Sequence, residues 1–388
     1  MKSTKLFKSF FESEKTGGII LLICTIFSML LANSYFQKGY IKMWHGSIGN
    51  YSIEHIINDG LMTIFFLMIG LELERELYIG ELSKIKNAML PIAGAIGGML
   101  FPALIYFIFN HNTNFKNGIG IPMATDIAFA IGILSLLGNK VPISLKIFLT
   151  ALAVIDDLGA IIIIALFYSE SVQLNYLFLA IAIWGLLFLF NRMKVYNLWI
   201  YLIGGIFMWY FMMNSGIHAT ITGVVLAFVI PFQKGEETSI SYKLQNWLHK
   251  PVSFIILPIF ALANTAIIIN LSNSLFETYS VGIALGLILG KPLGIILFSY
   301  IFVKLKLAKL PFDLSWKHIS GAGILGGIGF TMSIFITLLA FDDAMIINNS
   351  KLFIIIASFT SGIIGLLFLK RILKTEISEE IEEIEEIE

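Results

Sequence analysis

The sequence contains little cysteine and little charge. Cys24 is the only cysteine, so neither a disulfide framework nor a cysteine metal site can form within one chain. Only 13% of the residues are charged, whereas soluble domains carry about 25%. The formal net charge is zero, and we expect no nucleic-acid partner. The N-terminal stretch MKSTKLFKSFFESEK lacks a small-residue cleavage site, so we expect no removable signal peptide.

Apolar residues dominate what is present. They make up 57% of the chain, and the mean hydropathy is +0.86. About 20 apolar residues in a helix suffice to cross the hydrocarbon core of a bilayer. Long apolar windows separated by charged or turn-rich stretches predict an all-α polytopic membrane protein with about twelve spans, near 16–34, 53–73, 88–109, 120–137, 143–168, 174–191, 196–213, 216–232, 251–271, 281–303, 318–341 and 350–369.

The basic residues indicate the orientation of these spans, because Lys and Arg collect in cytoplasmic loops. Lys291 lies inside the tenth span. The other basic residues lie in loops or near the ends of spans, all on one side except Lys38, Lys42, Lys116 and Lys351. This bias predicts that both termini lie in the cytoplasm.

Two adjacent carboxylates, Asp156 and Asp157, lie in the apolar run ALAVIDDLGA (151–160), in the middle of a predicted span. A charged residue at that depth costs about 2.5–3.5 kcal/mol on insertion scales, so we expect the pair to have a structural or functional role. It is either a buried hydrogen-bonding pair that only holds helices together, or an ion or proton site. Lys291 is the only cation that we expect to be unable to reach an interface, and it should pair with Asp126, Asp156 or Asp157.

Two spans are irregular. The fourth contains GIGIPMATDIAFAIG (118–132), and the eleventh contains the glycine-rich GAGILGGIGFTMSIF (321–335). A shift of 206 residues aligns Gly120 with Gly326, Thr125 with Thr331 and Phe129 with Phe335. Because the third and tenth spans start on opposite sides, spans three to five and ten to twelve would form inverted repeats with broken helices at a central site. The alternative is that these glycines only permit close helix packing.

The domain organisation follows from these patterns. We expect a single transmembrane domain over 1–374, with repeats over about 88–168 and 281–369. The remaining residues, 375–388, are rich in glutamate and predict a solvated tail, disordered or loosely helical, to which no function is assigned.

Six stretches of the chain resemble the NhaA-type sodium/proton antiporters of bacterial membranes. They run through most of the sequence and are NDGLMTIFFLMIGLELERE (58–76), PMATDIAFAIG (122–132), ALAVIDDLGAIIIIALFY (151–168), GIHAT (216–220), LILGKPLG (287–294) and GGIGFTMSIFI (326–336). The resemblance implies twelve helices, with broken spans four and eleven crossing near the membrane centre. It also implies a multi-pass protein of the bacterial inner membrane, and a homodimer assisted by an outer β-hairpin within 34–51.

The resemblance also implies roles for individual residues. Asp157 and Asp156 match the family's cation-binding and proton-exchanging aspartates, and Asp126 with Thr125 matches the acid and hydroxyl at the broken crossing. Lys291 matches the family's lysine in the tenth span.

A further group matches residues that set the family's pH response, namely Glu72, Arg75, Glu76 and His218. We expect His218 to lie near the acids at the cytoplasmic end of the second span. Glu74, where the family usually has a lysine, and Gln245, near a family glutamate, depart from the pattern.

These residues suggest a mechanism of ion exchange. Na⁺ and Li⁺ are hard cations that prefer oxygen ligands, which Asp157, Asp156 and Thr125 would supply. The same carboxylates can hold protons instead, so cation and proton compete for one site. We therefore expect an electrogenic, pH-regulated Na⁺(Li⁺)/H⁺ antiporter rather than an enzyme, with no cofactor. The alternatives are a sodium-coupled symporter of similar fold, an intramembrane aspartyl protease, whose GxGD signature is absent, and an ion channel.

Overall fold

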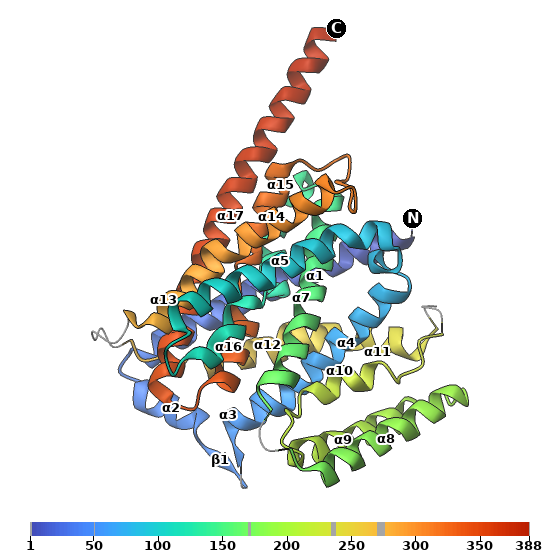
Figure 1. Ribbon diagram of the computed structural model, residues 1–388, viewed down its shortest axis with the longest axis vertical. Helices are drawn as coiled ribbons and strands as arrows, with labels where there is room; N and C mark the ends of the chain where they lie inside the picture. The colour runs from blue at the N-terminus through green and yellow to red at the C-terminus, as the bar shows by residue number, and fades with distance from the viewer. Residues whose placement is uncertain (1, 50, 170–171, 234–237, 270–275, 388) are drawn as a thin grey trace.

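The computed structural model describes residues 2–49, 51–169, 172–233, 238–269 and 276–387, with the backbone alone over 2–14, 139 and 376–387. The described chain is mostly helical (Figure 1). Its elements, in order, are α1 (Lys2–Ala32), α2 (Gln37–Trp44), β1 (Ser47–Ile48), β2 (Tyr51–Ser52), α3 (Ile53–His55), η1 (Ile56–Leu61), α4 (Met62–Tyr78), η2 (Glu81–Ser83), α5 (Ile85–Asn110), η3 (Lys116–Met123), α6 (Ile127–Ser135), η4 (Gly138–Lys140), α7 (Ile143–Phe167), α8 (Leu174–Arg192), α9 (Leu198–Asn214), α10 (Ile221–Ala227), α11 (Ile240–Pro251), η6 (Val252–Ile256), α12 (Leu257–Asn264), α13 (Thr278–Leu285), η8 (Gly286–Gly290), α14 (Lys291–Lys304), α15 (Trp316–Gly326), α16 (Phe330–Ala340) and α17 (Ala344–Ile387).

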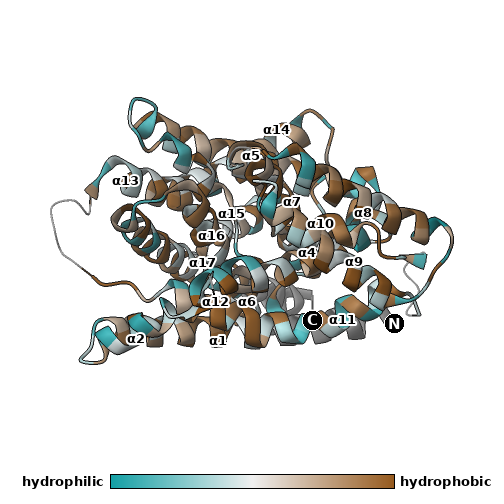
Figure 2. Ribbon diagram, turned by 90° about the horizontal axis from the view of Figure 1, so that it is seen from below, coloured by the Kyte–Doolittle hydropathy of each residue, from teal (hydrophilic) through white to brown (hydrophobic). Residues whose placement is uncertain are grey.

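Nine helical segments within the described residues are long and apolar enough to cross a membrane. The pair α15 and α16, bent by 44° at a short break, makes a tenth, and α9 is an apolar helix of 17 residues. Figure 2 shows hydrophobic residues along much of the helices, with many hydrophilic ones in loops. Large hydrophobic side chains are exposed on several helices, for example Leu104, Leu166 and Phe178. An apolar surface of this kind suits a lipid environment. The predicted eighth span differs most from expectation, because α10 within it has only seven residues.

Several spans are interrupted where the sequence weakens a regular helix. Pro122 lies at the end of η3 and cannot donate a backbone hydrogen bond, and residues 124–126 are not helical. Residues 327–329, which include Gly327 and Gly329, separate α15 from α16. These two breaks contact each other, since the backbone N–H of Asp126 donates to the carbonyl of Ile328 at 2.6 Å. The irregular spans predicted from glycine and proline are therefore broken at the expected places.

Small residues bring α5 and α14 unusually close together. A Cβ atom added to Gly97 would collide with the carbonyl oxygen of Gly294, and one added to Gly294 would collide with the carbonyl oxygen of Gly97. Only glycine permits backbones to approach in this way. Lys291 lies at the start of α14, the helix that this contact holds against α5.

The expectation for the loop between the first two spans needs correction. The outer loop between the first two spans is largely helical, because α2 occupies most of it, and the antiparallel hairpin has only two residues per strand, with Ser47 opposite Ser52 and Ile48 opposite Tyr51. The tail over 375–388, expected to be disordered or loosely helical, is helical up to Ile387. Figure 1 shows the backbone of α17 continuing as one helix far beyond the other helices, and it ends at Ile387.

Candidate ion site

Asp126 caps two helices at the contact between the broken spans. Its Oδ1 accepts the backbone N–H of Phe129 at 2.9 Å, in the first turn of α6. Its Oδ2 accepts the backbone N–H and the hydroxyl of Thr331, at 3.0 and 2.5 Å, in the first turn of α16. Helix N-termini carry partial positive charge, so this one carboxylate balances two of them. Asp126, and not Lys291, is therefore the charged residue at these two N-terminal ends.

The two adjacent aspartates of α7 point in different directions, because successive residues on a helix project about 100° apart. Asp156 is fully buried and forms an ion pair with the fully buried Lys291, through Oδ2. The hydroxyl of Thr125 lies 2.8 Å from the same oxygen and 2.9 Å from the carbonyl oxygen of Gly326. The expected pairing of Lys291 with a buried acid is therefore present, and the partner is Asp156.

Asp157 faces a small cavity of about 20 Å³. Its Oδ1 is buried and has no hydrogen-bond partner in the described part of the chain, and the same holds for Oδ1 of Asp156. Unpaired buried carboxylate oxygens are costly unless a proton or a cation satisfies them. The cavity is also lined by acids and hydroxyls from four other elements, including Glu72, Asp126, Ser253 and Thr331. It thus offers oxygen ligands to a small hard cation.

The acids of α4 extend from this cavity toward the end of the helix. Glu72 lines the cavity and is 3% exposed, and its buried Oε1 has no hydrogen-bond partner among the residues that the structure describes. Arg75 and Glu76 contact each other at 3.5 Å, and Glu76 also accepts the backbone N–H of Glu81 at 3.1 Å. Glu74 is buried as well, at 4% exposure, in place of the lysine that the resemblance implies. The structure therefore brings Glu72 to the ion site and leaves Arg75 and Glu76 nearer the helix end.

His218 is not part of this group, so the expectation that it lies near Glu72 is wrong. It lines a different cavity, of about 430 Å³, together with His55 and Asp59 at the opposite end of the same span. Asp59 and Glu72 lie about 20 Å apart along the helix, at 1.5 Å per residue. His218 contacts the carbonyl oxygen of Tyr168 at 2.8 Å, and His55 pairs with Asp59 at 3.2 Å.

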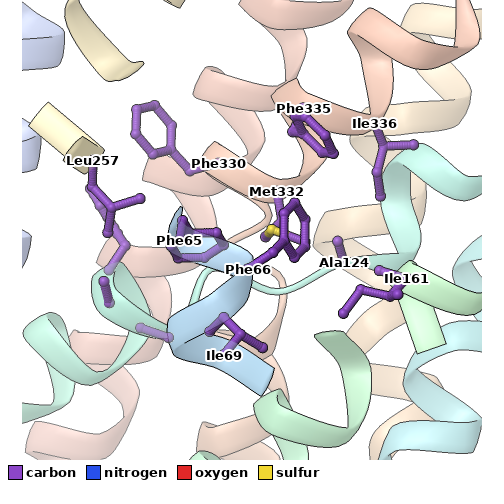
Figure 3. Close-up of a cluster of buried hydrophobic side chains, with 14 of the residues drawn as sticks. Phe65, Phe66, Ile69, Ala124, Ile161, Leu257, Phe330, Met332, Phe335 and Ile336 are labelled. Carbon is purple, nitrogen blue, oxygen red and sulfur yellow. The ribbon is translucent and has the colours of Figure 1, made fainter. Parts of the chain in front are cut away.

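A layer of aromatic and aliphatic side chains separates the two cavities. Phe335 of α16 lines the cavity of His218, and Met332, one turn earlier, lines the cavity of Asp157. Figure 3 shows Phe66 of α4 lying beside Phe335, with Ile336, Ala124 and Ile161 close by. The rings of Phe66 and Phe335 are 5.3 Å apart between centroids, and both residues are buried.

Two residues of the polar interior, Ser253 and Lys351, were not predicted from the sequence. Ser253, in the π-helical turn η6, lines the cavity of Asp157, and a lone serine among apolar residues gave little signal. Lys351 is 4% exposed. The expectation that Lys291 is the only buried cation is therefore wrong. Asp343 could have indicated from the sequence that Lys351 lies within a helix rather than in a loop. Its Oδ1 caps α17 by accepting the N–H groups of Met345 and Ile346.

The chain is similar to known proteins over nearly its whole length. The profile of the family described as Na⁺/H⁺ antiporter 1 matches residues 8–369. The chain is 62% identical to the Na(+)/H(+) antiporter NhaA of Flavobacterium psychrophilum, covering 98% of this chain and 99% of that protein. It is 62% identical to the NhaA of Cytophaga hutchinsonii, covering 99% and 100%, and 57% identical to that of Dechloromonas aromatica, covering 95% and 96%. With a matching profile and relatives of this identity over nearly its whole length, the chain belongs to the Na⁺/H⁺ antiporter 1 family.

Proposed function

We propose that this membrane protein exchanges Na⁺ or Li⁺ for protons at Asp157 and Asp156, and that Thr125 supplies a further oxygen ligand. The observation that carries the proposal is that Oδ1 of Asp157 and Oδ1 of Asp156 are buried without a hydrogen-bond partner among the described residues, and that Asp157 lines a cavity where the two broken spans meet. Family membership supports sodium/proton exchange as the activity. The residue assignments and the steps below are our inference.

The contacts of Asp156 suggest how two protons move against one cation. When Na⁺ binds between the two carboxylates, its charge competes with Lys291 for Asp156. Lys291 then loses its counter-ion in a fully buried position, which favours release of its proton. Asp157 releases the other proton as it binds the cation. With two protons entering per cation leaving, one net charge moves inward, and a potential of about 150 mV contributes about 3.5 kcal/mol to each cycle.

Alternating access requires that the cation site open to one side at a time. The layer around Phe66 and Phe335 lies between the cavity of Asp157 and the larger cavity of His218. Separation of these rings would open the site to the outer cavity. We propose that Asp126 holds the N-terminal ends of α6 and α16 together during this movement, because it bonds to both.

The membrane arrangement is proposed on the same basis. We propose twelve crossings in all, in which α9 and the short α10 form the seventh and eighth, and inverted repeats over about 88–168 and 281–369. Both termini lie in the cytoplasm, and the inner membrane of a bacterium is the location. The hairpin of β1 and β2 stands out from the helical body (Figure 1) and supports a homodimer in which the hairpins pair.

Reconstituted protein tests the proposal. Addition of NaCl to proteoliposomes that contain only this protein should discharge an imposed proton gradient. Asp157→Asn should abolish the discharge, whereas Asp342→Asn, which changes an exposed acid outside the site, should retain it. Normal exchange by Asp157→Asn at alkaline pH would show that the site is wrongly assigned. Discharge that depends on an added organic substrate would favour a sodium-coupled symporter instead.

A further inference from the structure

Lys351 is a second buried lysine, remote from the ion site. It lies two turns into α17 and is 4% exposed. Its Nζ donates to the amide oxygen of Asn264 at 3.2 Å and lies 3.8 Å from Oε1 of Glu54. The amide nitrogen of Asn264 in turn donates to Oδ1 of Asn58 at 2.8 Å. We refer to Lys351, Glu54, Asn264 and Asn58 as the outer polar bridge.

The bridge lies between two cavities. On one side is the cavity of about 430 Å³ that contains His218 and Asp59, and on the other is a cavity of about 300 Å³ lined by Trp44, Asn264 and Lys351, among others. Glu54 lines both. The polar groups of the bridge can therefore be hydrated from both sides if they separate.

The bridge also joins two groups of helices. Lys351 is carried by α17, which packs on α13, α15 and α16 in the proposed repeat of spans ten to twelve. Asn264 ends α12, which packs chiefly on α1, and Glu54 and Asn58 lie in α3 and η1 at the start of span two, outside the repeats. A relative movement of the repeats against the remaining helices would have to break the Lys351 contacts.

A polar bridge at this place is poorly explained by stability. Lys351 is buried, whereas the side chain of Glu54 is 24% exposed. Burying the lysine costs desolvation energy that its attraction to a partner often fails to recover, and an apolar residue of similar volume is often as good or better. Polar contacts have a different advantage where surfaces separate repeatedly, because water replaces them when they break. The position of the bridge suits an interaction that opens and closes.

We propose that Lys351 is a further residue of the transport cycle, whose bridge to Glu54 and Asn264 keeps the outer side closed and must break before the ion site can face outward. The inference rests on the alternating access proposed above. It assigns Lys351 to the control of access and not to the transported proton or cation.

Accessibility of a single cysteine tests the inference. Cys24→Ser removes the only native cysteine, and Thr337→Cys introduces a reporter on α16, at a fully buried position near the outer end of the helix. A membrane-impermeant, positively charged methanethiosulfonate is applied from the outside to cells. Lys351→Met and the milder Glu54→Gln should each be modified about ten-fold faster than the parent, a factor equivalent to about 1.4 kcal/mol of lost closing energy.

Controls separate closure from stability. Lys42→Met removes an exposed lysine of α2 and should react at the parent's rate. The double variant Lys351→Met with Glu54→Gln should react no faster than the faster single variant, because both remove the same contact. Rates within two-fold of the parent in both single variants, with or without a lower melting temperature, would overturn the proposal, as would fully additive effects in the double variant.

Exchange by the parent protein is measured in parallel. If the parent exchanged no Na⁺ for H⁺ while the bridge variants still reacted faster, the bridge would stand as a closing contact and the proposed function would fail. If the parent exchanged normally and reaction rates were unchanged, only the role of Lys351 would fail.

Discussion

The same substitution at two buried aspartates should change stability in opposite directions. Asp126→Asn and Asp157→Asn each remove one carboxylate at nearly constant volume. Asp126 accepts three hydrogen bonds at two helix N-termini, whereas Oδ1 of Asp157 has no partner in the described part of the chain. We therefore expect Asp126→Asn to destabilise the protein and Asp157→Asn to leave it unchanged or more stable.

The contacts of Asp126 give the size of the expected loss of stability in Asp126→Asn. An asparagine at 126 retains one accepting oxygen, and its amide group faces N–H or O–H donors, so at least one hydrogen bond to a charged group is lost, at about 1.5–3 kcal/mol. Loss of the charge beside two helix N-termini costs about 0.3–1 kcal/mol each at the usual values. The sum is about 2–5 kcal/mol. At roughly 2 °C per kcal/mol for a chain of this size, the melting temperature should fall by about 4–10 °C.

Thermal unfolding of detergent-purified protein, followed by tryptophan fluorescence with and without NaCl, tests this expectation. Sodium at 100 times its dissociation constant should stabilise the parent by about 2.7 kcal/mol. Asp126→Asn should keep a sodium-dependent increase, and Asp157→Asn should lose it. Equal falls in melting temperature for both variants would refute the distinction between a helix cap and an ion ligand.

Three other predictions follow from the same geometry. Lys291→Gln should stop exchange or make it electroneutral, whereas Lys291→Arg should keep some current. A robust Na⁺-driven current from the Gln variant on a solid-supported membrane would show that Lys291 carries no transported proton. Glu72→Gln should shift the pH profile of exchange when the pH is varied on the cytoplasmic side, and His218→Ala should shift it only when the pH is varied on the outer side. Equal responses of a variant to both sides would contradict the positions of the two cavities. Gly97→Ala should cost about 1–3 kcal/mol or more by overpacking α5 against α14, whereas Gly185→Ala, with open space around it, should be neutral in thermal unfolding.

Short-range features of the sequence predicted the two broken spans and the buried ion pair of Lys291. Proline and glycine mark the two breaks because they remove a donor or a side chain from the helix, and the shared register of Thr125 and Thr331 brought the breaks into correspondence. Charge in an apolar run identified Asp156 and Asp157, and the need for a counter-ion identified Lys291. Each of these inferences depends on local composition and on the cost of burying charge, which hold without knowledge of the packing.

Features that depend on the three-dimensional neighbours were not accessible in this way. The side on which His218 lies is set by how a short loop at Gly216, with φ +81°, turns toward α7, and the sequence carries no measure of that direction. Lys351 reads as a loop residue because the residues before it are polar, and only the cap at Asp343 shows that the helix has already begun. Ser253 matters only because η6 places it in the cavity, and π-helical turns have no simple sequence signature.

The spacing of Asp156 and Asp157 is itself an argument about mechanism. Two acids four residues apart would lie on one face of α7, where a single cation or a single lysine could satisfy both. Adjacent acids diverge, so Asp156 keeps Lys291 and Thr125 as partners while Asp157 meets the cavity. A cation that engages both must therefore draw Asp156 away from Lys291 as it displaces a proton from Asp157. In the proposed mechanism, two separate protonation events are thereby coupled to one binding event through a single peptide unit, as the proposed exchange of two protons for one cation requires.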